Sequence, residues 1–171
     1  MTPPEHHIPQ LGTLTAGDQE LLITRATAQD VPAIVSLLAD DVLGQSREHP
    51  GTDPRYAEAF DAIDADPNQV LLVVRAGAQL AASAQLTFIP GLSRGGALRA
   101  QVEAVRVAPA HRGAGLGEAF FRWMATYAAD RGAAMMQLTS DRSRTDAVRF
   151  YERLGFTASH VGMKLPLDAD G

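Results

Sequence analysis

The chain has 171 residues, 46% hydrophobic and 20% charged, which suits one compact domain with a buried core. It has no cysteine, which excludes a disulfide framework, a thiolate nucleophile and a zinc–cysteine site. The formal net charge of −5 argues against a general nucleic-acid binder. No apolar run approaches the roughly 20 residues of a membrane helix, and no secretory signal pattern is present. We therefore expect a cytoplasmic protein with no nucleic-acid or membrane partner.

Three segments are expected along the chain. Residues 1–20 are polar and contain Pro, Gly and Thr, which indicates a flexible N-terminal arm. Residues 21–167 carry the regular hydrophobic patterns of a single domain, and residues 168–171 form a short tail. No internal repeat or long linker divides the domain further.

Hydrophobic periodicity predicts alternating strands and helices in this domain. Thr27 can cap the first helix, and Asp30 three residues later makes a weak capping-box pattern. The order is strand, two helices, three strands, helix, strand, helix and final strands, which predicts a mixed α/β sheet covered by helices. The expected strands are Leu21–Arg25, Val70–Arg75, Gln79–Ile89, Leu98–Val107, Ala134–Thr139, Phe156 and Val161–Leu165, and the expected helices follow Thr27 or span Arg55–Ile63, Ala114–Arg131 and Ser143–Leu154.

The segment HRGAGLG, which starts at His111, places Gly113, Gly115 and Gly117 at alternate positions between a strand and a helix. The unpaired amides at a helix N-terminus are a natural site for phosphate, and glycine lets a ligand approach the backbone closely. Arg112 could add charge-assisted hydrogen bonds. A glycine-rich turn without a ligand accounts for these residues about as well.

Two common phosphate motifs do not fit this segment. A P-loop ends in Gly-Lys-Ser/Thr, whereas Gly117 is followed by Glu118 and Ala119. A dinucleotide fingerprint needs its third glycine where Glu118 stands, and it needs its first glycine close to the strand, but residues 108–112 intervene.

A third pattern fits. The sequence Arg112-x-x-Gly115-x-Gly117 after a strand resembles the coenzyme-A loop of the GCN5-related N-acetyltransferase (GNAT) superfamily. The downstream segment 147–156, AVRFYERLGF, resembles the second signature of the same family, and the two segments occur in the family's order and spacing. The resemblance implies an α/β fold with a mostly antiparallel sheet, a splayed parallel strand pair and helices on both faces.

The resemblance also implies a binding site for acetyl-CoA as co-substrate. The pantetheine arm would lie between splayed strands at 101–107 and 135–139, hydrogen-bonded to exposed strand backbone. The diphosphate would take amides of the glycine stretch. Arg144 stands where the family often has a CoA-contacting asparagine, so its equivalence is open. The expected cofactor-binding residues are Val105, Val107, Arg112, Gly113, Ala114, Gly115, Gly117 and Arg144, and no metal is expected.

Two residues are expected to be catalytic. Tyr151 matches the family tyrosine that protonates the departing thiolate, although it could simply pack against Phe150. Glu103 matches a position where the family often has a glutamate that deprotonates the amine through water. In a flat strand Glu103 would share a face with Val105 and Val107. The alternative is an exposed Glu103 that is ion-paired with a nearby arginine.

The resemblance implies direct transfer of the acetyl group to an amine. We expect the primary amine of a small molecule, because the sequence shows no extended basic or peptide-binding surface. Acidic side chains at Asp40, Asp41, Glu48 and Asp53 could attract such an amine, or they could be a solvated loop. Alternatives are a protein or peptide N-acetyltransferase, a non-catalytic acyl-CoA-binding regulatory domain, and a flavin- or nucleotide-binding domain. A homodimer is left open.

Overall fold

The computed structural model describes residues 10–40, 48, 51 and 53–167. The chain divides into two compact units, residues 1–137 and 138–171, each described by itself below. The expectation of a single domain over residues 21–167 stays a prediction.

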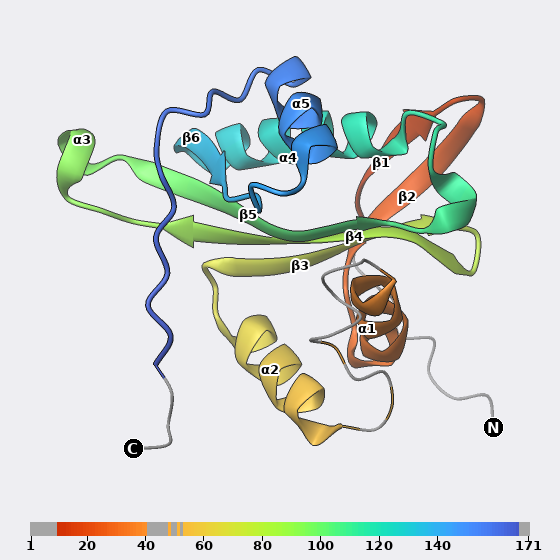
Figure 1. Cartoon of the computed structure of the whole chain (residues 1–171). Helices are drawn as coiled ribbons and strands as arrows, with labels where there is room; N and C mark the ends of the chain where they lie inside the picture. Colours follow the sequence, from red (N-terminus) through yellow and green to blue (C-terminus); the bar gives the residue numbers. More distant parts are fainter. Residues whose placement is uncertain (1–9, 41–47, 49–50, 52, 168–171) are drawn as a thin grey trace. The chain divides into compact units, whose positions relative to one another are not determined.

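The first unit is built on a six-stranded mixed sheet whose strands lie in chain order (Figure 1). Neighbouring strands from β1 to β5 are antiparallel, whereas β5 and β6 form a parallel pair. This confirms the mixed α/β sheet expected from the sequence. The strands are β1 Gln10–Ala16, β2 Gln19–Arg25, β3 Gln69–Ala76, β4 Gln79–Ile89, β5 Leu98–Val107 and β6 Ala133–Leu138.

Helices cover both faces of this sheet. Helices α1 (Val31–Ala39) and α2 (Pro54–Ala65) lie on one face and α4 (Leu116–Asp130) lies on the other (Figure 1). On the first face, Ile34 of α1 and Phe60 of α2 join Val73 of β3 in one buried cluster. Short turns complete the unit, at η1 Ala28–Asp30, α3 Ser93–Gly96 and η2 Pro109–His111.

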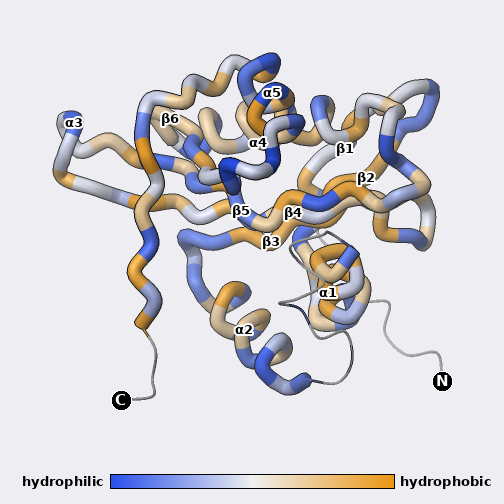
Figure 2. The backbone as a smooth tube through the Cα atoms, viewed as in Figure 1, coloured by the Kyte–Doolittle hydropathy of each residue, from blue (hydrophilic) through white to orange (hydrophobic). Residues whose placement is uncertain are grey.

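The hydropathy pattern explains this layering. Hydrophobic residues run along β3 and β4 and along α1 (Figure 2). Val70, Leu72 and Val74 of β3 are almost fully buried, as is Val73 between them, so both faces of this strand are covered. On α4 the buried side chains recur at helical spacing, as one apolar stripe facing the sheet, at Leu116, Phe120, Phe121, Met124 and Ala128.

The capping box predicted at Thr27 is confirmed. The Asp30 carboxylate accepts from the Thr27 backbone N–H at 2.7 Å and from its hydroxyl at 2.9 Å. It also accepts from Arg75 Nη2 of β3 at 2.7 Å, which links the start of α1 to the sheet. Burial raises the pKa of Asp30, but the hydrogen bonds from Arg75 and Thr27 outweigh burial and hold the pKa below its usual value.

Two sequence expectations are corrected here. The flexible arm does not extend to residue 20, because Gln10–Ala16 forms β1 and pairs with β2. The final strands are also wrong, since residues 156–167 contain no strand. Hydrophobic and hydrophilic residues do alternate there (Figure 2). Alternation alone does not make a strand, which also needs a hydrogen-bonded neighbour, and the apolar side chains stay exposed at Val161, Met163, Leu165 and Leu167.

Candidate active site

A β-bulge shapes β5 at its centre. Gln85 of β4 pairs with Glu103, but Ser83 pairs with Arg106, so two residues of β5 lie opposite one residue of β4. The bulged residue Ala104 has φ +54°, which is unusual for a residue other than glycine. The bulge reverses the alternation of side chains beyond it.

The bulge changes which side chains of β5 lie on the same face of the sheet. Glu103 and Arg106 share one face of the sheet, since their partners Gln85 and Ser83 do. Val107 pairs with Ala82 and lies on the opposite face. The sequence expectation that Glu103, Val105 and Val107 share one face assumed a flat strand. It is wrong, because the bulge places Glu103 and Val107 on opposite faces.

The Glu103 carboxylate is exposed on the face of the sheet that carries α1 and α2. Among the described residues it has no hydrogen bond or ion pair, so the alternative role, a pairing with Arg99 or Arg106, is not found. The side chain is therefore available to water or to a ligand.

The glycine stretch forms a tight turn between β5 and α4. Gly113 and Gly115 have φ of +82° and +78°, in the left-handed region that disfavours side chains. A Cβ built on either glycine would meet nothing within 4 Å, so open space lies beside the backbone. Gly115 is the N-cap of α4 and supplies no side-chain bond to the first-turn amides, whereas Gly117 lies inside the helix. Such amides can bind an anion.

Arg112 makes contacts within the protein that the sequence did not predict. Its backbone N–H donates to the Pro109 carbonyl at 3.3 Å. Its Nε donates to the Val107 carbonyl at 3.0 Å, and its Nη2 forms an ion pair with Asp40 at 2.7 Å. Arg112 thus connects the turn to the ends of β5 and α1. Because the backbone N–H and side chain of Arg112 already have partners within the protein, the backbone N–H groups of the glycines are better placed to bind a ligand.

An open cavity of about 230 Å³ adjoins the turn. It lies between the β1–β2 turn and the start of α4, and Ala114 and Gly115 contribute to its wall. Glu118 and Arg122 line the same cavity and pair with each other at 2.8 Å. Two of the residues expected to bind CoA therefore border a hollow.

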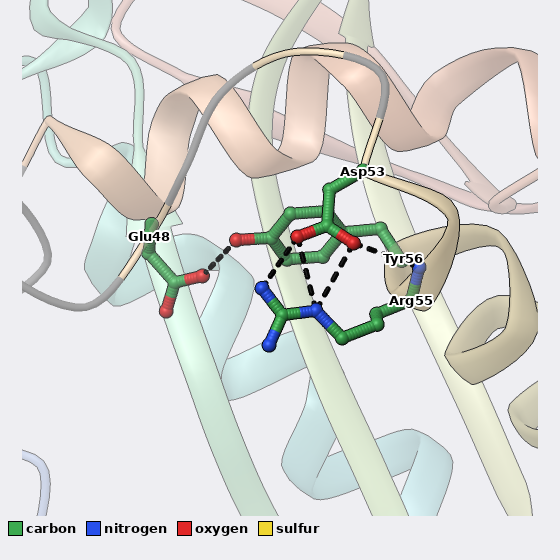
Figure 3. Close-up of polar contacts among 4 residues, drawn as sticks. All are labelled: Glu48, Asp53, Arg55 and Tyr56. Carbon is green, nitrogen blue, oxygen red and sulfur yellow. Dashed lines mark hydrogen bonds and ion pairs between the residues drawn. The ribbon is translucent and has the colours of Figure 1, made fainter.

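The acidic residues considered for attracting an amine have partners of their own. The Tyr56 hydroxyl donates to the Glu48 carboxylate at 2.8 Å, and the Arg55 guanidinium donates to the Asp53 carboxylate from both Nε and Nη2 (Figure 3). Asp53 also caps α2 by accepting from the Arg55 backbone N–H at 3.0 Å, and its hydrogen bonds raise the pKa of Arg55. Asp41 lies outside the described residues. These pairs reduce the charge that the loop presents to a ligand.

The second unit carries the other expected site residues on α5 (Thr145–Arg153). Tyr151 packs edge-on against Phe150 and Phe156, with ring centroids 5.5 and 6.0 Å away. Arg144 is the N-cap of α5. The structure therefore gathers Glu103 and the glycine turn in one unit and Tyr151 and Arg144 in the other, and their meeting in one site stays a prediction.

The family of this chain follows from comparison with known proteins. The model of the acetyltransferase (GNAT) family matches residues 34–156. The chain belongs to this family. The match includes β5 with its bulge, the glycine turn and the Tyr151 helix.

Relatives of this GNAT chain include a glucosamine 6-phosphate N-acetyltransferase from Trypanosoma brucei brucei, 35% identical over 52% of this chain and 58% of the relative. A streptothricin acetyltransferase from Streptomyces lavendulae is 38% identical over 34% of this chain and 31% of the relative. The chain thus spans less than two thirds of the curated relatives it matches. A solved transcriptional regulator from Bacillus halodurans is 42% identical with a TM-score of 0.83, covering 86% of this chain and 99% of that one.

No helix among the described residues of this GNAT protein is both long and apolar enough to span a membrane. The main feature that the sequence did not reveal is the bulge at Ala104. Alanine rarely adopts a positive φ, so no residue type marks the position, and only the pairing of β5 with β4 does.

Proposed function

We propose that this GNAT protein transfers the acetyl group of acetyl-CoA directly to the primary amine of a small molecule. The observation that carries the proposal is the placement of Glu103, an exposed carboxylate without a partner among the described residues, beside a bulge in the strand that leads into the glycine turn. Members of the family use acetyl-CoA, and two relatives are named for acetylating small amines.

The proposed reaction replaces the carbon–sulfur bond of the thioester with a carbon–nitrogen bond and moves one proton, in net terms, from nitrogen to sulfur. The amine nitrogen attacks the thioester carbonyl carbon, and the carbon–sulfur bond breaks. Glu103, acting through water, takes the proton that the amine must lose, and Tyr151 donates the proton that the thiolate gains. Solvent then exchanges one proton with each side chain, and both return to their starting states.

The first-turn amides of α4 would hold the diphosphate of CoA. Gly115 caps this helix without a side chain, and space is open beside Gly113 and Gly115. Val105 and Val107 would flank the pantetheine through the backbone of β5, while Arg144 on α5 would approach the cofactor separately. Arg112 would bind the diphosphate in competition with its own ion pair to Asp40, while its hydrogen bond to the Val107 carbonyl holds the turn in place.

The test is release of free thiol from acetyl-CoA across a panel of small amines, with wild type, Tyr151→Phe and Glu103→Gln. We expect turnover by wild type, a loss of about 10²-fold or more in kcat for Tyr151→Phe, and a smaller loss for Glu103→Gln that is greatest at low pH, where more amine is protonated. Unchanged kcat in Tyr151→Phe would remove the acid role.

A second candidate function is a regulatory domain that binds acyl-CoA without turning it over. The 42% identity to a solved transcriptional regulator favours it. Such a domain would be stabilised by CoA through mass action yet release no thiol with any acceptor. A protein or peptide acceptor is the third outcome, and it would appear as turnover with amino-terminal peptides but not with small amines.

A further inference from the structure

A row of neutral amide side chains crosses four adjacent strands of the sheet. Gln85 Nε2 of β4 donates to Gln69 Oε1 of β3 at 2.6 Å, and Gln137 Nε2 of β6 donates to Gln101 Oε1 of β5 at 2.8 Å. Thr87 lies between the two pairs, since it is the strand partner of both Gln69 and Gln101. We call these four glutamines, together with Thr87, the amide row.

The amide row lies on the same face as Glu103. Gln69 alternates along β3 with Val73, which packs against α1 and α2. Gln85 is the strand partner of Glu103, and Gln101 lies two residues before it on β5. The row therefore runs directly beside the carboxylate proposed as the base.

The row retains hydrogen-bonding capacity. Each amide has two N–H donors and one carbonyl acceptor. The bonds within the described residues leave the Gln85 and Gln137 carbonyls and the Gln101 N–H groups without a protein partner. All five side chains are only half-buried, so a ligand can reach them.

We propose that the amide row is the acceptor-binding surface and that it selects a primary amine carrying several hydroxyl groups. This rests on the proposed function above. Hydroxyl groups both donate and accept, so they match the mixed donors and acceptors that the row leaves open. An apolar amine of the same size would displace water from these amides without replacing its hydrogen bonds, which costs affinity.

The side chains of the row itself offer no cation to an anionic acceptor. Recognition of phosphate or carboxylate relies on arginine, lysine or clustered backbone amides. The amide row contains only uncharged side chains. The charged groups beside it are the Glu103 carboxylate, the Asp66 carboxylate, which accepts from Gln69 Nε2 at 3.2 Å, and Arg99, which lies two residues before Gln101 on the same face of β5. A neutral polyhydroxylated ring bearing an amine satisfies both the row and the base.

The experiment uses ring-matched amines that differ in hydroxyl groups. Glucosamine is compared with cyclohexylamine, and 2-deoxystreptamine with cyclohexane-1,3-diamine, in wild type and in Gln85→Met and Gln101→Met, which keep chain length but remove the amide. Gln79→Met is the matched control, because Gln79 is an exposed residue at the start of β4, outside the row. Thermal unfolding and the KM for acetyl-CoA verify that each variant folds and binds the cofactor.

We expect wild type to prefer the hydroxylated member of at least one pair by about 100-fold in kcat/KM, as sites built to bond hydroxyl groups do. Each row variant should lose about tenfold of that preference through a higher KM for the hydroxylated amine, and Gln79→Met should retain it. A preference that survives in both row variants, or a wild-type preference for the ring without hydroxyl groups, would overturn the assignment.

Binding without turnover separates this inference from the proposed function. Titration of the same amines into the CoA-loaded protein, followed by NMR, reports occupancy of the row when no acetyl group is transferred. A hydroxylated amine could bind to wild type but not to Gln85→Met, and yet no turnover be seen. That result would support the amide row as a binding surface and contradict the proposed acetyltransferase activity. Turnover of amines with no dependence on hydroxyl groups would sustain the enzyme and contradict the row.

Discussion

Asp40 at the end of α1 holds Arg112 of the glycine turn in an ion pair of 2.7 Å, across 72 positions of sequence. The same guanidinium donates to the Val107 carbonyl at the end of β5. A residue expected to bind a diphosphate thus connects two elements of the fold. The pair sets up a competition, because an incoming phosphate offers Arg112 a second acidic partner.

Replacement of Asp40 should reveal this competition. In Asp40→Asn, Arg112 is released toward the turn, and we expect CoA to bind a few-fold more tightly at low ionic strength, with the gain fading at high salt. Stability should change by less than about 1 kcal/mol, because both side chains are roughly half exposed. Calorimetric titration of CoA at two salt concentrations measures the effect. Asp61→Asn, on the exposed side of α2, controls for net charge, and weaker binding in Asp40→Asn would contradict the competition.

The role of the glycine turn in binding CoA can be tested by comparing Gly115, in the turn, with Gly77, which has a similar backbone conformation but lies outside the turn. Gly115→Ala and Gly77→Ala both place a side chain at positive φ, +78° and +60°, with open space around it. Each should cost about 1 kcal/mol of stability from backbone strain. Only Gly115→Ala should raise the Kd for CoA, because its strain moves the first-turn amides of α4. Equal CoA affinity in the two variants would show that the glycine turn does not bind CoA.

The buried pair of Asp30 and Arg75 should make stability depend on pH. The pKa of Asp30 is held below its ordinary value of 3.8, so ionised Asp30 stabilises the fold above that pH, and the contribution is lost as the pH falls through the folded-state pKa. Asp30→Asn should cost about 3 kcal/mol near neutral pH, since Arg75, which is largely shielded from water, then lacks its counter-charge. Urea unfolding at pH 7 and below pH 4 should show the two proteins converging at acid pH. A difference independent of pH would rule out the charge as the cause.

Close packing of β1 on α4 predicts a specific clash. A Cβ at Gly12 would lie 2.7 Å from Nε1 of Trp123, whose ring stacks on Tyr127. Gly12→Ala should therefore lower the unfolding free energy by about 1–3 kcal/mol. Gly91→Ala, where the nearest atom is 4.0 Å away, should be tolerated. In a double-mutant cycle, Trp123→Phe should recover part of the Gly12→Ala cost by removing the pyrrole nitrogen, and strict additivity would argue against the contact.

Local chemistry accounts for most of what the amino-acid sequence predicts correctly by itself. Thr27 and Asp30 are three residues apart and form the capping box on their own. Gly113 and Gly115 mark the turn because few other residues tolerate positive φ. The strand and helix periods of β3, β4 and α4 likewise follow from the order of their own residues. Period-2 alternation misleads at residues 161–165, because a strand also requires a neighbour that the local residues do not specify.

Features that join distant segments were decided only by the tertiary structure. The partner of Arg112 is Asp40, and the neighbours of Gln85 are Gln69 and Glu103, in each case through the packing of separate elements. The bulge at Ala104 belongs with these, because it exists only in the register between β4 and β5. A side chain's face and partner depend on how separate strands and helices align. That alignment is the sum of many weak contacts over the whole fold, so no short stretch of residues encodes it.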